Sequence, residues 1–473
     1  MNKLIYNYIL MTNNNINNLE QKLDNKSEDP KYARNLSFSD LFFAGYGFIV
    51  GAGIFSLLPY IIKYGQGLSW FSFVVGGLIC LITGLSYAKL NSLYPSNDAE
   101  YSWIMNVLNF NKDKDPEKTP KFVKFLSAAI IWIVVLIGLF TAATVLVGQA
   151  DIIRLYLNYS KPKIIALMIA FPTLIVMFGN KSSTVLNKLI MALVTLAFAL
   201  LYGQAGAKGT NFRQVDFNLG DLNTEGILKS SFITIFAYNG FQSIVQLSEE
   251  ANDKADIPKS ILSSVSFSTL IYGLITISVI SLIGLKTSSS SVSPLADAYG
   301  VFFGKKGTDV VNLLALAALT NTILIITLSR SRLIQKLSVR GILPKFLSKL
   351  TSIGEFFGLE KFSENDESKK KTIPINSVLT LSFITFLITF IRKGAIEYLA
   401  SLTSSFIFIV FTLVNTLVII NYFKKKTDDE IAKEKEVDKT LPMIKGFPWY
   451  AVVGFVISVS YLNLSRKYLK LIK

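Results

Sequence analysis

The chain has 473 residues, of which 51% are apolar and 17% charged, and its formal net charge is +16. Apolar residues in this proportion, gathered in blocks, exclude an ordinary soluble protein and predict an integral membrane protein. Histidine is absent and Cys80 is the only cysteine, which excludes imidazole metal ligands, Ser-His-Asp triads and an internal disulfide framework.

The first element in chain order is a polar tail, residues 1–38, expected to be disordered and cytoplasmic because it has little apolar surface to bury. After it, windows of about 20 residues, the length that crosses a bilayer, give eleven candidate spans. They cover 41–62, 69–88, 125–149, 164–179, 184–205, 227–247, 262–285, 310–329, 373–391, 395–422 and 446–464.

The basic residues lie in alternate loops between these spans. Loops near 89–124, 330–372 and 423–445 are rich in lysine, whereas those near 63–68, 206–226 and 392–394 are short or poor in positive charge. This pattern is typical of cytoplasmic retention of Lys and Arg, so the net charge does not indicate a nucleic-acid partner. We expect a multi-pass protein with its N-terminus in the cytoplasm, in the plasma membrane.

Two spans contain small residues where a helix would be interrupted. The first has Gly51, Ala52, Gly53, Ile54 and Phe55, and the sixth has Phe236, Ala237, Tyr238, Asn239 and Gly240. Close helix packing is the simpler interpretation of one such pattern. Two patterns at corresponding places in two halves of a chain instead indicate the discontinuous helices of a transporter.

The chemistry of two interrupted helices fits a zwitterion. A helix that begins after Gly51 would present free amides of Gly53, Ile54 and Phe55, which suit a carboxylate. Opened backbone from Ala237 to Gly240 would offer carbonyls to an ammonium group. Charged residues lie only at the edges of the spans (Lys63, Asp151, Asp309 and Glu397), which favours a substrate with a neutral side chain.

Motifs in the right order resemble one known family. Gly51-Ala52-Gly53-Ile54-Phe55 is similar to a Gly-x-Gly-Ile-Phe segment, and Tyr238-Asn239-Gly240-Phe241 is followed by Glu249-Glu250 and Ile257-Pro258. Ser331-Arg332 precedes Gly341-Ile342-Leu343-Pro344 at the matching interval. Together they resemble amino acid permeases of the amino acid, polyamine and organocation superfamily. Departures are Asp98-Ala99 for paired glycines, Gln242 for an acidic residue and Val339-Arg340 for Arg-Asp.

The resemblance implies an all-α membrane protein that works by alternating access. Residues 39–205 and 226–422 would form two inverted five-helix repeats with broken first and sixth helices, and 423–473 would add one or two helices, giving 11–12 spans. Phe55, Phe236 and Tyr238 would be gates or walls of the pocket. With eleven spans, the basic tail from Arg466 to Lys473 would face outside, against the charge trend.

The sequence offers only a few candidate residues for coupling or gating. Some relatives of this family carry a lysine in the middle of the fifth span, but here Lys188 lies at the start of that span. Lys188, Glu249 and Glu250 remain the titratable candidates for coupling to a proton, with sodium as the other candidate ion.

Three functional hypotheses stay open at this point. The first is a secondary carrier for neutral amino acids, with an amino acid and the bilayer as partners. A polyamine or organocation carrier would need an acidic pocket residue, and none is visible. A sensor that keeps the fold without transport is the third. The sequence indicates no cofactor, metal or nucleic acid, and no catalytic residues that would make an enzyme.

Overall fold

The computed structural model describes residues 36–96, 98–108, 120–177, 183–220, 223–247, 251–253, 255–339, 341–351, 373–391, 395–426, 428–438, 441 and 446–471. Within these ranges the regular secondary structure is helical, apart from two isolated bridges that pair Leu36 with Ala251 and Thr351 with Ile373.

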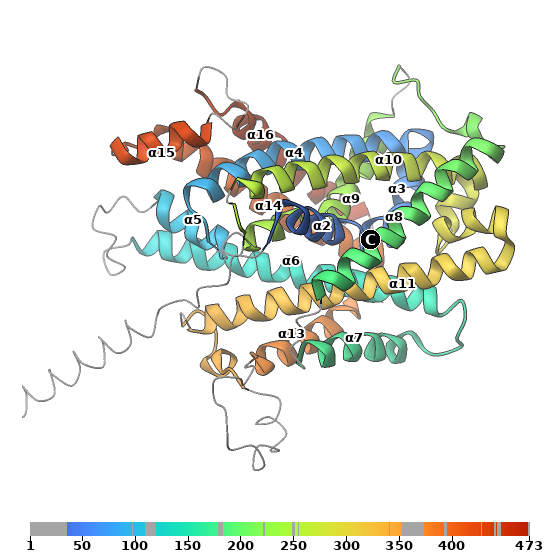
Figure 1. The fold of residues 1–473 in the computed structure, drawn as a ribbon, viewed down its shortest axis with the longest axis horizontal. Helices are drawn as coiled ribbons and strands as arrows, with labels where there is room; N and C mark the ends of the chain where they lie inside the picture. The colour runs from blue at the N-terminus through green and yellow to red at the C-terminus, as the bar shows by residue number, and fades with distance from the viewer. Residues whose placement is uncertain are drawn as a thin grey trace, which may run out of the picture.

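Figure 1 shows the helices, most of which are long and packed side by side. In chain order they are α2 (Phe38–Ile49), α3 (Ala52–Gly65), η1 (Gln66–Leu68), α4 (Ser69–Leu93), α5 (Ala99–Leu108), α6 (Lys121–Ile153), α7 (Lys161–Met177), α8 (Ser183–Lys208), η2 (Phe212–Gln214), α9 (Thr224–Tyr238), η3 (Phe241–Leu247), α10 (Asp256–Ser290), α11 (Pro294–Val339), η4 (Lys345–Ser348), α13 (Ile375–Ile388), α14 (Ile396–Phe423), α15 (Asp428–Asp438) and α16 (Trp449–Leu471).

Six helical stretches of the described chain are long and apolar enough to cross a membrane, and α2 and α13 are shorter apolar helices. Each of the eleven predicted intervals contains a helix, so the prediction of an all-α membrane protein is confirmed. Large apolar side chains are exposed on α7, α8 and α13, as on a surface that faces lipid. They include Leu167, Phe171, Leu174, Leu189, Leu193, Leu196, Leu200, Phe383 and Leu387.

Several helices extend beyond the predicted spans, because a hydropathy window detects only their apolar middle. α10 and α11 are the longest, and each continues through a kink at a glycine with positive φ, 76° at Gly284 and 57° at Gly304. Glycine adopts this backbone without the clash that a Cβ would cause. The extension brings Lys89 into α4 and Arg330 into α11, although both lie just outside the spans predicted from hydropathy.

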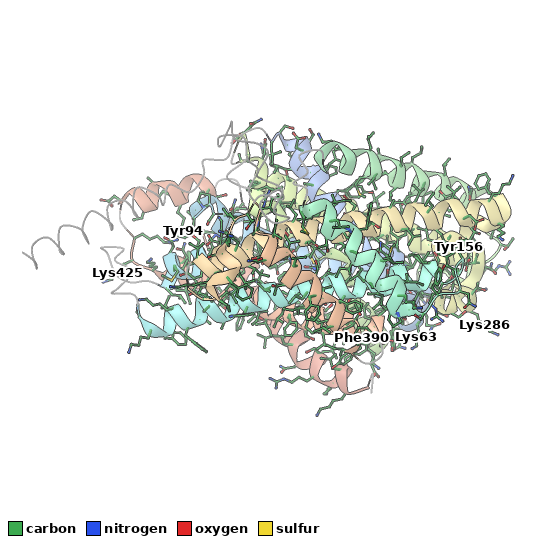
Figure 2. The ribbon with its side chains drawn as sticks, turned by 90° about the horizontal axis from the view of Figure 1, so that it is seen from below. Lys63, Tyr94, Tyr156, Lys286, Phe390 and Lys425 are labelled. Carbon is green, nitrogen blue, oxygen red and sulfur yellow. The ribbon has the colours of Figure 1, made fainter. Side chains whose placement is uncertain are left out.

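The two ends of the bundle are distinguished in Figure 2. Tyr94 and Lys425 lie at one end, and Lys63, Tyr156, Lys286 and Phe390 lie toward the other. The first end carries α5 and the C-terminal ends of α4 and α14 (Figure 1), and we call it the α5 end. Tyr94 and Lys425, which belong to loops predicted to be cytoplasmic, therefore lie at the end opposite to Lys63, which belongs to a loop predicted to be external.

The last helix, α16, packs along α14 and α4 and ends away from the α5 end. Near its C-terminus the Tyr468 hydroxyl donates to Glu397 Oε1 at 3.0 Å. The Tyr64 hydroxyl donates to the same oxygen at 2.6 Å. Glu397 is in the first turn of α14 and Tyr64 in the last turn of α3, so both mark the end that Lys63 occupies. This helix therefore runs from one end of the bundle to the other, and its basic last turns lie at the end that Lys63 occupies.

A short polar helix, α15, lies at the α5 end and is attached by a buried ion pair. Glu434 Oε1 is 2.9 Å from Nζ of Lys89, a residue of α4 whose relative exposure is 0%. Glu434 also pairs with Lys426, and Lys424 donates to the carbonyl of Asn106 in α5 at 2.8 Å. These contacts join the segment after α14 to α4 and α5.

The two interrupted helices lie inside the bundle. α10 packs against α2, α3 and α4, while α9 packs against α3, α4 and α14. In Figure 1, α2 is drawn in the middle of the molecule, with long helices on both sides of it. The residues around both interruptions are buried in one continuous apolar core.

Candidate functional site

The first interruption separates α2 from α3, and Gly51 is the residue that precedes α3. Ala52 is the first residue of α3, and no side chain caps this helix. Because the first amides of a helix have no acceptor within it, those of Gly53 and Ile54 carry partial positive charge at the interruption. The amide of Phe55 was also expected to be free, but it donates to the Gly51 carbonyl at 3.4 Å. That part of the prediction is wrong.

The second interruption follows Tyr238, the last residue of α9. Asn239 is extended, and Gly240 has a φ of 134°, a conformation that favours glycine. Gln242 holds this shape, because its Oε1 accepts from the amide of Gly240 at 3.1 Å and its Nε2 donates to Asn239 Oδ1 at 2.9 Å. Asn239 Nδ2 donates in turn to Thr141 Oγ1 on α6 at 2.9 Å. The carbonyl of Phe236 accepts from the amide of Asn239 at 3.1 Å, whereas the carbonyls of Ala237 and Tyr238, at the very end of α9, have no partner within their own helix.

The two interruptions touch each other. A Cβ on Gly53 would overlap the Cα and Cβ of Ala237, so only glycine lets α3 approach α9 this closely. A Cβ on Gly240 would lie 2.8 Å from Cβ of Phe48 on α2. The amide end of α3 and the carbonyl end of α9 are thereby brought together, with partial charges of opposite sign.

A tyrosine from α10 connects the two interrupted helices, and the sequence reasoning did not identify it. The Tyr272 hydroxyl lies 2.7 Å from the carbonyl oxygen of Ile49, at the end of α2. It also lies 3.3 Å from the carbonyl oxygen of Ala237, near the end of α9. One O–H group thus faces two carbonyls of the kind that would bind an ammonium group.

The three predicted aromatic residues are all buried beside the interruptions. The ring of Phe55 packs on Phe198 of α8 with 6.1 Å between centroids, and Phe236 lies in the same core. The hydroxyl of Tyr238 donates to the carbonyl of Phe73 on α4 at 2.8 Å. Tyr238 therefore directs its polar atom toward α4, whereas Phe55 contributes an apolar wall toward α8.

The candidate coupling residues lie elsewhere. Lys188 forms an ion pair with Asp40, in the first turn of α2. Asp40 Oδ2 also accepts from the amide of Ser37 at 3.0 Å, and the amide of Asp40 donates to Ser37 Oγ at 3.4 Å, which together form a capping box at the start of that helix. Lys188 therefore fastens α8 to the beginning of α2 and does not reach the interruptions. Glu249 and Glu250 lie outside the described residues.

A second buried charge cluster was not predicted. Arg330 of α11 is 6% exposed, and it interacts electrostatically with Glu100 of α5 and with Tyr87 of α4. The Tyr87 hydroxyl donates to Glu100 Oε1 at 3.2 Å. Burial raises the pKa of the Glu100 carboxyl, and the Arg330 charge opposes that shift. In the sequence, Arg330 comes directly after a predicted span, and Arg332 follows two residues later. The sequence alone does not show which of these two arginines points into the helix bundle.

The described part of the chain contains no group of three or more Asp, Glu, Cys or His side chains that could hold a metal ion. The polar groups at the interruptions are backbone amides and carbonyls with the neutral side chains of Thr141, Asn239, Gln242 and Tyr272. Such a set suits binding through hydrogen bonds and helix dipoles.

Comparison with known proteins identifies one matching family and several similar transport proteins. A family model described as "Amino acid permease" matches residues 36–464. "Cationic amino acid transporter 5" of Arabidopsis thaliana is 24% identical over 424 residues, which are 85% of this chain and 68% of that protein.

Two bacterial proteins are similar to shorter stretches of the chain. From Bacillus subtilis (strain 168), the "Methylthioribose transporter" is 24% identical over 356 residues, 70% of this chain and 72% of that protein. "Branched-chain amino acid permease BcaP" of the same strain is 23% identical over 359 residues, 68% of this chain and 71% of that protein. The chain spans about two thirds of the length of the plant relatives that it matches.

Proposed function

Because the chain belongs to the amino acid permease family, we propose that it is a secondary-active carrier that moves a neutral amino acid across a membrane by alternating access. The observation that carries the proposal is the contact between Gly53 and Ala237, which joins the amide end of α3 to the carbonyl end of α9. A small zwitterion has the two opposite charges that these ends attract. In this proposal the amides of Gly53 and Ile54 hold the carboxylate, and the carbonyls from Ala237 to Gly240 hold the ammonium group.

Alternating access in such a carrier requires that the interrupted helices move relative to the rest of the bundle. The interruptions fall in the first helix of each proposed inverted repeat, residues 39–205 and 226–422. The bond that the Gly240 amide donates to Gln242 Oε1 at 3.1 Å and the bond that Tyr272 donates to the carbonyl of Ile49 at 2.7 Å hold the two segments in the present arrangement. Movement would exchange some of these bonds for bonds to the substrate.

The neutral substrate class is supported by the side chains at the interruptions. Thr322, Phe48, Thr141, Gln242 and Tyr272 contact them or hydrogen-bond to them, and none of these carries a charge. A cationic side chain bound there would lack a counter-charge and would cost several kcal/mol. The relatives named as cationic amino acid transporters favour the competing candidate, a carrier for cationic amino acids.

We further propose that the α5 end faces the cytoplasm, which places the N-terminus there too, and that the protein lies in the plasma membrane. The lysine-rich loops at that end support this orientation. A proton or a sodium ion remains the proposed coupling ion.

The experiment is flux into proteoliposomes that contain the full chain, with protein-free liposomes as the blank. One labelled neutral amino acid is competed by leucine, alanine, arginine, putrescine and a thioether sugar, with and without imposed proton and sodium gradients. The proposal expects competition by the neutral amino acids only. Stronger competition by arginine would establish the cationic alternative, and ligand binding without flux would establish a sensor.

A further inference from the structure

Arg330 is a buried cation whose donors are only partly used. Its Nε and Nη1 have no hydrogen-bond partner among the described residues. A buried N–H without a partner costs free energy, and a guanidinium group stays charged in proteins. Glu100 and Tyr87 act on it electrostatically without bonding to these two nitrogens. Asp98 is the other acidic group that acts on Glu100. This local charge arrangement leaves hydrogen-bonding capacity for an anion.

The location of Arg330 connects it to the interruptions. It is eight residues beyond Thr322 on α11, which corresponds to about 12 Å along a helix. Thr322 is the side chain that a Cβ on Gly51 would overlap. On α6, a Cβ on Gly138 would lie 2.7 Å from Cγ of Arg330. Gly138 is one turn from Thr141, the residue that accepts from Asn239. Arg330 therefore lies between the interruptions and the α5 end, flanked by the helices that contact them.

We infer that Arg330 is a second carboxylate-binding position, which the amino acid occupies on its way between the interrupted helices and the α5 end, with Glu100 as the resting counter-charge. This inference rests on the proposed function. A guanidinium group binds a carboxylate through two parallel N–H bonds, which a lysine does not reproduce. When the substrate carboxylate arrives it replaces Glu100 as the partner of Arg330, and when it leaves Glu100 takes over again.

The test measures exchange of a labelled neutral amino acid by the full chain in proteoliposomes, with the KM determined separately from each face. The face that carries α5 is identified by impermeant labelling of a Lys425→Cys variant. We expect Arg330→Met to raise the KM at the α5 face about tenfold or more, with the KM at the other face within about twofold. Arg330→Lys should give an intermediate increase.

Glu100→Gln is a control variant in which the KM should change in the opposite direction. It removes the competitor for Arg330, so the KM at the α5 face should fall. A purely structural role predicts instead that all three variants impair exchange equally at both faces, and that result would overturn the inference. If Arg330→Met is not monodisperse in detergent, Arg330→Lys and Glu100→Gln decide the question. Absence of amino acid flux in the unmodified protein would overturn the proposed function and this inference together, whereas normal flux with unchanged KM values in the variants would overturn only this inference.

Discussion

The hydroxyl of Tyr272 lies 2.7 Å from the carbonyl oxygen of Ile49, and so ties α10 to the point where the first span is interrupted. The same hydroxyl is 3.3 Å from the carbonyl of Ala237 in the other interrupted helix. A side chain that serves both carbonyls fixes the spacing between the two helix ends. It also stands where the ammonium group of a substrate would compete for the same acceptors.

We predict that Tyr272→Phe lowers the stability of the protein by about 1–3 kcal/mol, because two buried carbonyls lose their donor. The measurement is the unfolding midpoint in detergent micelles, together with the rate of amino acid exchange, which should also fall. Tyr461→Phe is the matched control. Its hydroxyl pairs with Ser231 Oγ at 2.8 Å, and Ser231 already donates to the carbonyl of Ile227. An equal loss in both variants would contradict a special role for Tyr272.

Gly53→Ala is expected to abolish transport, since the added methyl group would overlap the backbone of Ala237 and force α3 away from α9. The readout is exchange in proteoliposomes, with expression and monodispersity checked first. Gly273→Ala makes the same change at a buried glycine of α10 that has open space where the Cβ would go. Gly273→Ala should retain activity. Full activity of Gly53→Ala would show that transport does not require the close approach of α3 to α9.

The glycine clusters made the interruptions predictable, because two such clusters at corresponding places in the two halves of the chain indicate discontinuous helices, whereas one alone would indicate close packing. The partners of those interruptions were not predictable. Tyr272 is more than 200 residues from Ile49 in the sequence, and one of many tyrosines in the spans. Arg330 looked like a flanking charge until the helix was seen to continue beyond the apolar window. A local sequence pattern predicts where the backbone of a helix is interrupted. Contacts between helices that are far apart in the sequence depend on how the helices pack, and a single sequence does not predict that packing.

The pair formed by Lys188 and Asp40 is predicted not to set the pH dependence of transport. Burial alone would raise the pKa of Asp40, but the hydrogen bonds from Lys188 and Ser37 outweigh burial and lower it. A carboxyl whose pKa is lowered by folding contributes stability above its unfolded pKa and loses it as the pH falls through the folded pKa. The Asp40 carboxyl therefore stays ionised near neutrality.

The double variant Asp40→Asn with Lys188→Gln should consequently keep the shape of the wild-type rate profile between about pH 5 and pH 8, with a lower rate at every pH. The lower rate follows because α2 loses its attachment to α8. The measurement is initial exchange rate against pH in proteoliposomes. A profile that became flat in the variant would show that this pair carries the coupling proton after all.

Glu434→Gln is predicted to detach α15 from the α5 end. Lys89 is fully buried, and removing one partner of a buried ion pair costs about 3–5 kcal/mol. Limited proteolysis between α14 and α16 should become faster in this variant. Asp428→Asn, at an exposed position of the same helix, is the control and should cut at the wild-type rate. Equal rates in all three proteins would show that the ion pair does not hold α15 in place.

The crossing of α16 leads to a topology prediction that needs no knowledge of the substrate. Tyr468 and Tyr64 both donate to Glu397 at the end opposite to Lys425, so the basic C-terminal turn lies at the other end of the bundle from Lys425. Single cysteines at Lys470 and Lys425, both exposed, should react with an impermeant maleimide from opposite sides of a sealed vesicle. The native Cys80 is buried in α4 and serves as an unreactive background. If both cysteines reacted from the same side, α16 would not cross the membrane. The hydrogen bond between Tyr468 and Glu397 could then not form as it does in this structure.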